Sequence, residues 1–288
     1  MFRRKSVASV SMLLAFTASV ACSSGEASPP SPGISTASGA VLDWDGASIT
    51  LPLDGFGMTL DEQRTVAAAR SIVFARCALG KDDVGDWVIE QARQGLIPTL
   101  PDANATHWLF GFWDAPFISQ HGWVPLPSGP MAPQYVQTDE ATGQVCAVNE
   151  DVTGLNPINI SELNSPGSVL VKYSFDAYEQ TISDPRFVRL RESVSACVSS
   201  QGYTIDPQSD LGSAVIDPTW TDEMTLASAV AQAGCRDQLG ATQQAGDIAA
   251  EYQNAQISAH EAELVAVKQL ADDRVAKATE ILRTVGLA

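Results

Sequence analysis

The five cysteines of this 288-residue chain constrain its fold more than any other feature. Cys22 lies close to the N-terminus, whereas Cys77, Cys146, Cys197 and Cys235 are spread over segments with the composition of a folded protein. In an exported protein, four cysteines can pair in three ways. We expect two structural disulfides, and we favour the pairs that are adjacent in chain order, Cys77 with Cys146 and Cys197 with Cys235. A zinc site is the alternative, but no two cysteines have C-x-x-C spacing and the chain has only three histidines.

The N-terminal segment has the pattern of a secretory signal. Arg3, Arg4 and Lys5 precede the apolar run VASVSMLLAFTASVA, which ends in small residues. This run is shorter and less apolar than a transmembrane helix, which needs roughly 20 apolar residues, and no later stretch reaches that length. We therefore expect residues 1–21 to be a signal peptide and the protein to be exported.

The sequence Ser19-Val20-Ala21-Cys22 resembles the lipobox of bacterial lipoproteins, in which the cysteine receives a diacylglyceryl group and becomes the new N-terminus. Lipoproteins usually carry leucine where this chain has Ser19, and ordinary signal-peptidase cleavage after Ala21 is the alternative. The odd number of cysteines favours lipidation, because ordinary cleavage leaves a free thiol in an oxidising compartment. Cys22 is the expected lipid anchor at the outer face of the cytoplasmic membrane, and residues 22–40, rich in Ser, Pro and Gly, are the expected flexible tether.

The charge of the chain argues against nucleic acid as a partner. The sequence contains 17 Lys+Arg and 34 Asp+Glu, a net charge of −17. Proteins that bind nucleic acid present a clustered basic surface, and few basic residues cluster here outside the N-terminus. An anionic membrane surface would repel the same acidic domain, so we expect membrane contact only through the lipid at Cys22.

Residues 41–288 predict a single domain of mainly α-helical structure. The clearest helix start is the capping box from Thr59 to Glu62, and Gly80 is the matching C-terminal stop. Proline at the first helical position is typical of two later helix starts. Further helices are therefore expected from Pro166, from Pro185 and over residues 222–240.

The C-terminal segment 242–285 predicts one long, coiled-coil-like helix. It contains no proline, and apolar residues recur every seven positions: Ile257, Leu264, Ala271, Ala278 and Val285. Arg274 interrupts the second apolar seam. About 40 residues at 1.5 Å each make a helix of about 60 Å, so we expect part of it to project or to pair with another helix. A helix broken into a packed hairpin is the alternative.

Residues 96–160 show no sustained helical or strand period, and we expect an irregular packed region there. The preceding stretch GASITLPLDGFGMT is expected to be extended or to form a lone strand. Within the irregular region, HWLFGFWDAPFISQHGW is dense in aromatic residues. Its rings either fill the core between helices or form an exposed surface that binds a glycan or peptide. On the second interpretation the candidate ligand-binding residues are His107, Trp108, Trp113, Asp114, His121 and Trp123.

Four segments together resemble a family of actinobacterial secreted lipoproteins of uncharacterised function. They are LPLDGFGMTLDEQ, GQVCA, DPRFVRLRESVSACVSSQGY, and AQAGCRDQLG followed by the long helix. The resemblance covers roughly residues 51–288. The family usually has Cys-Met where this chain has Cys77-Ala78 and Cys197-Val198. The resemblance implies export, a lipid anchor and a disulfide-stabilised helical domain, but it implies no catalytic residue because the family has no established activity.

No catalytic motif singles out an enzyme class. HEAEL, which begins at His260, has Leu264 where a zinc protease needs its second histidine, and no G-x-S-x-G or P-loop occurs. We expect a membrane-anchored lipoprotein with a non-catalytic binding or scaffolding role toward a cell-envelope protein or glycan, without a cofactor or metal.

The alternative is a cell-wall-active hydrolase or an accessory subunit of one. Clustered carboxylates with raised pKa values in a cleft would favour the hydrolase. An exposed apolar stripe along the long helix would favour a protein partner or self-association.

Overall fold

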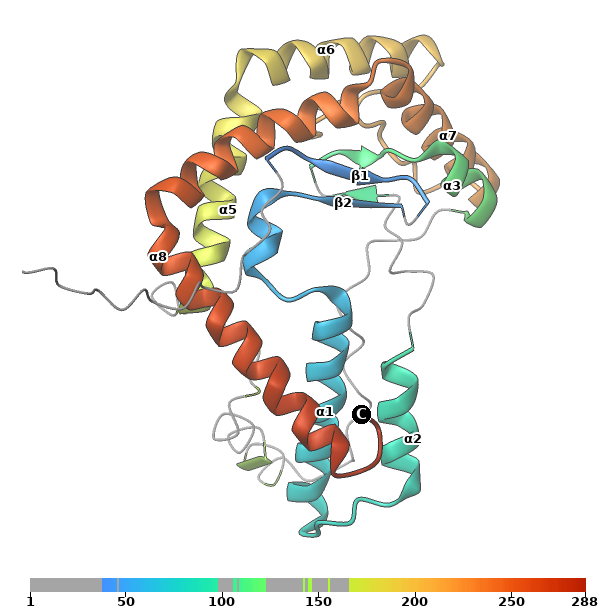
Figure 1. Cartoon of the computed structure of the whole chain (residues 1–288). Helices are drawn as coiled ribbons and strands as arrows, with labels where there is room; N and C mark the ends of the chain where they lie inside the picture. Colours follow the sequence, from blue (N-terminus) through green and yellow to red (C-terminus); the bar gives the residue numbers. More distant parts are fainter. Residues whose placement is uncertain are drawn as a thin grey trace, which may run out of the picture. The chain divides into compact units, whose positions relative to one another are not determined.

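The computed structural model describes residues 38–45, 47–97, 106–107, 109–122, 142, 145–146, 155 and 166–288. The predicted signal peptide, Cys22 and most of the predicted tether lie outside these residues. The described part of the chain is mainly helical, as the sequence predicts (Figure 1). Its main helices are α1 (Leu60–Leu79), α2 (Asp86–Gly95), α3 (Ala115–His121), α5 (Pro166–Ser183), α6 (Pro185–Ser200), α7 (Asp222–Gln238) and α8 (Ala241–Arg283).

Two short antiparallel hairpins accompany the helices. Strand β1 (Val41–Asp43) pairs with β2 (Ser48–Thr50), and β3 (Thr106–His107) pairs with β4 (Gly111–Phe112). The sequence predicts the extended segment that forms β2 but not its partner β1. A 3₁₀ helix, η1 (Pro52–Phe56), follows β2 and leads into α1.

The helix ends follow the signals in the sequence. The Thr59 side chain accepts a hydrogen bond from the Glu62 backbone N–H (3.2 Å), and the Thr59 N–H donates to Glu62 Oε2 (2.7 Å). Gly80 ends α1 in the left-handed conformation, with φ of 60°. Helices α5 and α6 begin at Pro166 and Pro185 as predicted. These boundaries are local, because each depends on residues within one turn of the helix end.

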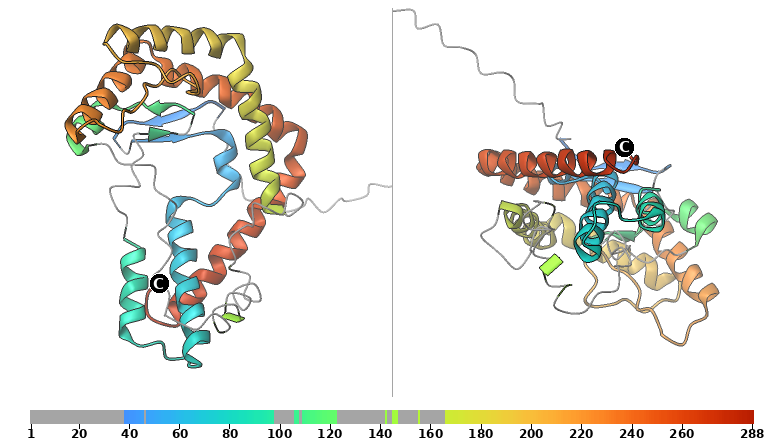
Figure 2. Two further views of the ribbon diagram at one scale, coloured as in Figure 1. Left: turned by 180° about the vertical axis from the view of Figure 1, so that it is seen from behind. Right: turned by 90° about the horizontal axis from the view of Figure 1, so that it is seen from below.

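Helix α8 is one long helix with a kink, and it does not fold back as a hairpin (Figure 2). The backbone at His260 leaves the helical region, with φ of −132° and ψ of 25°. No proline causes this kink. Two features lie beside it: the Ser258 hydroxyl donates to the Asn254 carbonyl (2.8 Å), a type of bond that often bends helices, and the His260 ring stacks on that of Tyr173 of α5, with the ring centroids 4.0 Å apart.

The apolar seam of α8 pairs with helices of the same chain. Before the kink α8 packs with α6 and α7 around Ile248. Near the kink it packs against α5 and η1 around Leu264, and after it against α1 around Ala278 (Figures 1 and 2). The seam of α8 is therefore covered by intramolecular contacts, so of the two expected outcomes the helix pairs with other helices. Val265 and Leu270 on the outer side remain exposed.

Two disulfides join the pairs that chain order favours. Cys77, near the end of α1, is bonded to Cys146, which is almost fully buried, and Cys197 of α6 is bonded to Cys235 of α7. The second bond lies beside the largest apolar cluster, to which Phe187, Val194 and Val198 of α6 contribute. Each bridge therefore fixes an element of the core to a segment distant in sequence.

Candidate functional site

In the aromatic segment, residues 107–123, the Phe and Trp side chains whose burial the structure describes lie in the core. Phe110 and Trp113 are fully buried, and Phe112 is nearly so. Trp113, Phe112 and Phe117 pack with Ala229 and Ala233 of α7. These rings fill space between α3, α7 and the hairpins, so Trp113 does not present a face on which a sugar could stack.

The six predicted ligand-binding residues do not form a common surface. Trp108 and Trp123 lie outside the described residues, and for His107 only the backbone of β3 is described. Trp113 and Asp114 are in the core, whereas His121 is exposed at the end of α3 with its ring 4.5 Å from that of Phe117. The exposed-surface interpretation therefore fails for Trp113 and Asp114.

Asp114 caps the N-terminus of α3. Its Oδ1 accepts a hydrogen bond from the Phe117 N–H (2.8 Å), while its Oδ2 is buried without a hydrogen-bond partner. Burial raises the pKa of Asp114; the Phe117 hydrogen bond opposes this, and the negative charge of Asp237 adds to it. A lone carboxyl group that caps a helix explains this environment without a catalytic role.

Arg236 is a fully buried arginine that no sequence pattern indicates. It lies in the last turn of α7, is fully buried, and donates to the Phe112 carbonyl (3.0 Å), the Leu211 carbonyl (3.1 Å) and Ser213 Oγ (2.9 Å). Its Nε has no partner, and burial lowers the pKa of Arg236 to about 9. The guanidinium thus ties α7 to β4 and to the 211–213 turn.

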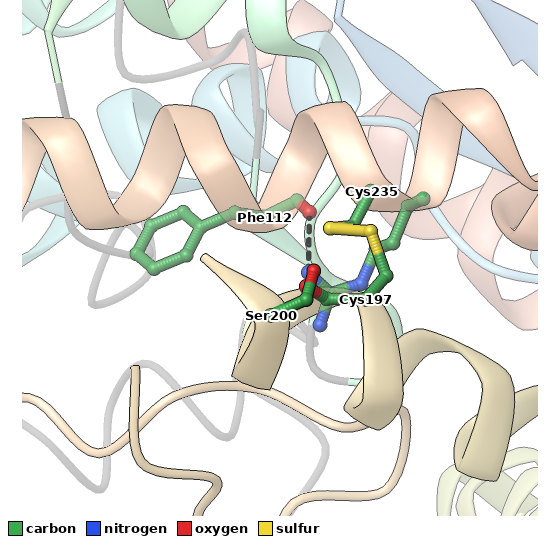
Figure 3. The surroundings of a disulfide bond; sticks show 5 residues. Phe112, Cys197, Ser200 and Cys235 are labelled. Carbon is green, nitrogen blue, oxygen red and sulfur yellow. Dashed lines mark hydrogen bonds between the residues drawn. A yellow bond between two sulfur atoms is a disulfide. The ribbon is translucent and has the colours of Figure 1, made fainter. Parts of the chain in front are cut away.

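The surroundings of Arg236 include the second disulfide. Figure 3 shows the Cys197–Cys235 bond with Phe112 and Ser200 close to it, and its dashed line marks the hydrogen bond that the Phe112 carbonyl accepts. Gly111, with φ of 67°, is needed here because a Cβ atom would lie 2.7 Å from Ser213 Oγ and 3.0 Å from Arg236 Nη2. The guanidinium of Arg236 donates to two backbone carbonyls and one hydroxyl and so holds α7, β4 and the 211–213 turn together. We call this set of contacts the clamp.

Two further carboxyl groups have raised pKa values, and each has a local structural partner. Burial raises the pKa of Asp54, whose Oδ2 accepts from the Leu51 N–H (2.7 Å). Burial also raises the pKa of Asp210, to which the Tyr178 hydroxyl donates (3.0 Å). Neither carboxyl group is coupled to another raised one, which a pair of hydrolase carboxylates would require.

A polar network joins the α5–α6 corner to α8. Arg186 lies between Asp184 and Glu251, at 2.8 Å and 2.7 Å, and the Tyr252 hydroxyl donates to Asp184 (2.9 Å). The hydrogen bonds from Arg186 hold the pKa of Asp184 well below its ordinary value. Asp184 also caps α6, so this network fixes the angle at which α6 leaves α5.

An exposed aromatic side chain that the sequence analysis does not single out stands over the buried core. Trp44, in the turn between β1 and β2, is 46% exposed, and its ring centroid lies 5.0 Å from that of Trp113 in an edge-to-face arrangement of 62°. Asp43 and Asp45 flank it in sequence. Its position in a D-W-D-G turn is the signal that could have revealed it, because such turns project their side chains.

The described residues contain no group of three or more His, Cys, Asp or Glu side chains placed to hold a metal ion. Within the same part of the chain, no helix combines the length and hydropathy that a membrane span requires. No known protein family, curated protein or solved structure matches this chain.

Proposed function

We propose that this protein is an exported lipoprotein, anchored by Cys22 at the outer face of the cytoplasmic membrane, with a non-catalytic binding or scaffolding role in the cell envelope. The observation that carries the anchor is cysteine pairing. The four cysteines after Cys22 pair with one another, which leaves no cysteine of this chain to pair with it. Lipidation would remove the free thiol that an oxidising compartment disfavours.

The non-catalytic role is supported by the use of the buried polar groups. Asp54, Asp114 and Asp184 accept backbone hydrogen bonds beside helix ends, and Arg236 donates to two carbonyl groups of the chain. Groups engaged in this way stabilise a scaffold, while catalytic groups need free reach toward a substrate. Exposed Trp44 is the side chain through which we expect contact with an envelope glycan, since a half-exposed indole supplies a rigid apolar face.

The anchor is tested by expressing the full chain in a bacterial host and measuring the mass of the mature N-terminus. We expect an N-terminal Cys22 that carries a diacylglyceryl group, and a protein that fractionates with membranes until detergent is added. The C22S variant should be secreted in soluble form. An unmodified Cys22 in the mature chain would refute the anchor.

The role is tested by sedimentation with purified cell-wall peptidoglycan. We expect the protein to co-sediment without releasing soluble fragments, and Trp44→Ala to weaken binding, whereas Trp87→Ala, which removes another exposed tryptophan, should leave it unchanged. Release of soluble fragments would contradict the non-catalytic role and favour the hydrolase. Equal loss in both variants would contradict the assignment of Trp44.

A further inference from the structure

The loop between α6 and α7, residues 201–221, exposes apolar side chains. Val215 is 42% exposed and Ile216 is 44% exposed, although valine and isoleucine ordinarily lie in a protein core. Isolated apolar side chains on a surface are common, whereas contiguous ones bordered by polar residues mark an interaction site. The two side chains therefore acquire significance if they belong to a larger contiguous surface.

Hydrogen bonds and a ring contact bring four side chains of this loop together. The Val215 N–H donates to the Thr204 carbonyl (2.8 Å), which places Val215 beside the residue that follows Tyr203. The Trp220 N–H donates to the Asp217 carbonyl (3.0 Å), and the Trp220 ring returns to the Tyr203 ring, with the centroids 6.0 Å apart in an edge-to-face arrangement. Both rings are partly exposed. We call the surface of these four residues the apolar tip: Tyr203, Val215, Ile216 and Trp220.

Buried polar contacts hold the chain beneath the apolar tip in one conformation. The clamp fixes the 211–213 turn to α7. The Ala214 N–H donates to Gln232 Oε1 (3.0 Å), and Gln232 is fully buried. Gly212 has φ of 68°, and a Cβ atom there would lie 2.5 Å from Ser195 Oγ of α6. The apolar tip is therefore pre-organised, which lowers the entropy lost when a partner binds.

The charge around the apolar tip selects the kind of partner. Residues 201–235 contain no Lys, Arg or His, and every charged residue among them is acidic: Asp206, Asp210, Asp217, Asp222 and Glu223. A second copy of this chain would bring the same acidic residues against them, and like charges across an interface are costly. An anionic membrane is disfavoured for the same reason. Charge complementarity therefore requires a basic partner.

We propose that the apolar tip is a docking surface for a basic protein segment that also carries apolar side chains. Tryptophan and tyrosine are the residues on which binding energy concentrates at protein interfaces, and the acidic border would attract the partner's Lys and Arg. Val215 and Ile216 offer a glycan neither a flat ring nor a hydrogen-bonding group. This surface is distinct from Trp44, through which we expect contact with a glycan.

The test is fluorescence anisotropy of labelled synthetic peptides with the C22S form of the full chain, so that its outcome does not depend on the anchor. A peptide of alternating lysine and valine has one basic and one apolar face when extended, and we expect it to bind. A lysine–serine peptide of equal charge should bind at least about tenfold more weakly, because it lacks the apolar contacts. A glutamate–valine peptide should not bind, because the acidic border repels it.

Ile216→Asp is the decisive variant, because it removes an apolar contact while adding a negative charge. Binding by charge alone would be as strong or stronger, whereas docking on the apolar tip should weaken by at least about tenfold. Leu270→Asp adds the same charge at an exposed position of α8 and should not weaken binding. Far-UV circular dichroism should show the wild-type fold in both variants, since both positions are exposed.

The docking surface is refuted if the lysine–valine peptide does not bind, if the lysine–serine peptide binds equally well, or if Ile216→Asp retains binding. A wild-type dimer in analytical ultracentrifugation that Ile216→Asp dissociates would also overturn it and would indicate a second copy of the chain. Trp44→Ala should bind the peptide normally, and Ile216→Asp should still co-sediment with peptidoglycan. Failure of the docking surface is therefore distinguishable from failure of the glycan contact.

Discussion

Removal of the Cys197–Cys235 disulfide should destabilise the protein by about 4 kcal/mol. The two cysteines are 38 residues apart. In the chain-entropy description, a cross-link that closes a loop of this length removes about 13 cal/mol/K from the unfolded ensemble, which is about 4 kcal/mol at 25 °C. The double variant C197A/C235A regains this entropy when it unfolds. Its folding equilibrium constant should fall roughly 700-fold.

Urea unfolding followed by far-UV circular dichroism measures this loss. The midpoint should fall without a change in the folded-state spectrum, and the Tm should fall by roughly 8–16 °C for a domain of this size. Cys235 is nearly buried beside the largest apolar cluster, so the small void left by alanine adds to the loss. Wild-type protein unfolded under reducing conditions lacks the Cys77–Cys146 bond as well, so its midpoint should lie below that of the variant.

The Cys77–Cys146 disulfide provides the matched comparison. Cys77 and Cys146 are 69 residues apart, and the same relation gives about 4.4 kcal/mol, only about 0.5 kcal/mol more. The two double variants should therefore lose similar stability although their surroundings differ. A loss below about 1 kcal/mol for C197A/C235A, or a gap of several kcal/mol between the variants, would refute the entropic reasoning and place the effect in local packing or in unfolded-state solvation.

Three further changes test the structural contacts. Arg236→Met removes the hydrogen bonds that Arg236 donates to the buried carbonyls of Phe112 and Leu211 and should cost about 2–4 kcal/mol in urea unfolding; a neutral result would contradict the clamp. Asp184 has a lowered folded-state pKa, so its contribution is present above the ordinary aspartate pKa and is lost as the pH falls below it; Asp184→Asn should flatten the pH dependence of the urea midpoint between about pH 2 and 5, and an unchanged slope would contradict this. Thr59→Ala removes the α1 cap and should cost about 1 kcal/mol by the same assay, with Thr59→Ser as the control that retains stability.

The parts of the fold that depend on neighbouring residues could be predicted from the sequence. Thr59 and Glu62 bond reciprocally at the start of α1, and Pro166 and Pro185 begin α5 and α6, because caps and first-turn prolines act within four residues. The disulfide pairs also followed chain order. Strand β1, which pairs with β2, was not predicted, because a strand of three residues carries almost no periodic signal in the sequence.

The candidate site was less predictable, because burial depends on what packs against a side chain. The aromatic segment has one composition whether Trp113 is buried or exposed, and only its contacts with α7 show that it is buried. Nothing in the sequence indicates that Arg236 is buried, because a basic residue near a helix C-terminus is ordinarily solvated and favoured by the helix dipole. Its burial follows from the position of β4 and the 211–213 turn.

The sequence by itself determined where α1, α5, α6, α7 and α8 begin and the expectation of two disulfides, and it is the basis of the hypothesis that Cys22 is lipidated, since these depend on local pattern and residue type. Tertiary structure decided the rest. The heptad pattern of α8 is equally consistent with an intermolecular coiled coil, but α1, α5 and η1 cover the seam within the chain. The kink at His260 lets α8 follow three clusters in turn, because packing energy summed over many buried contacts outweighs the cost of one irregular residue.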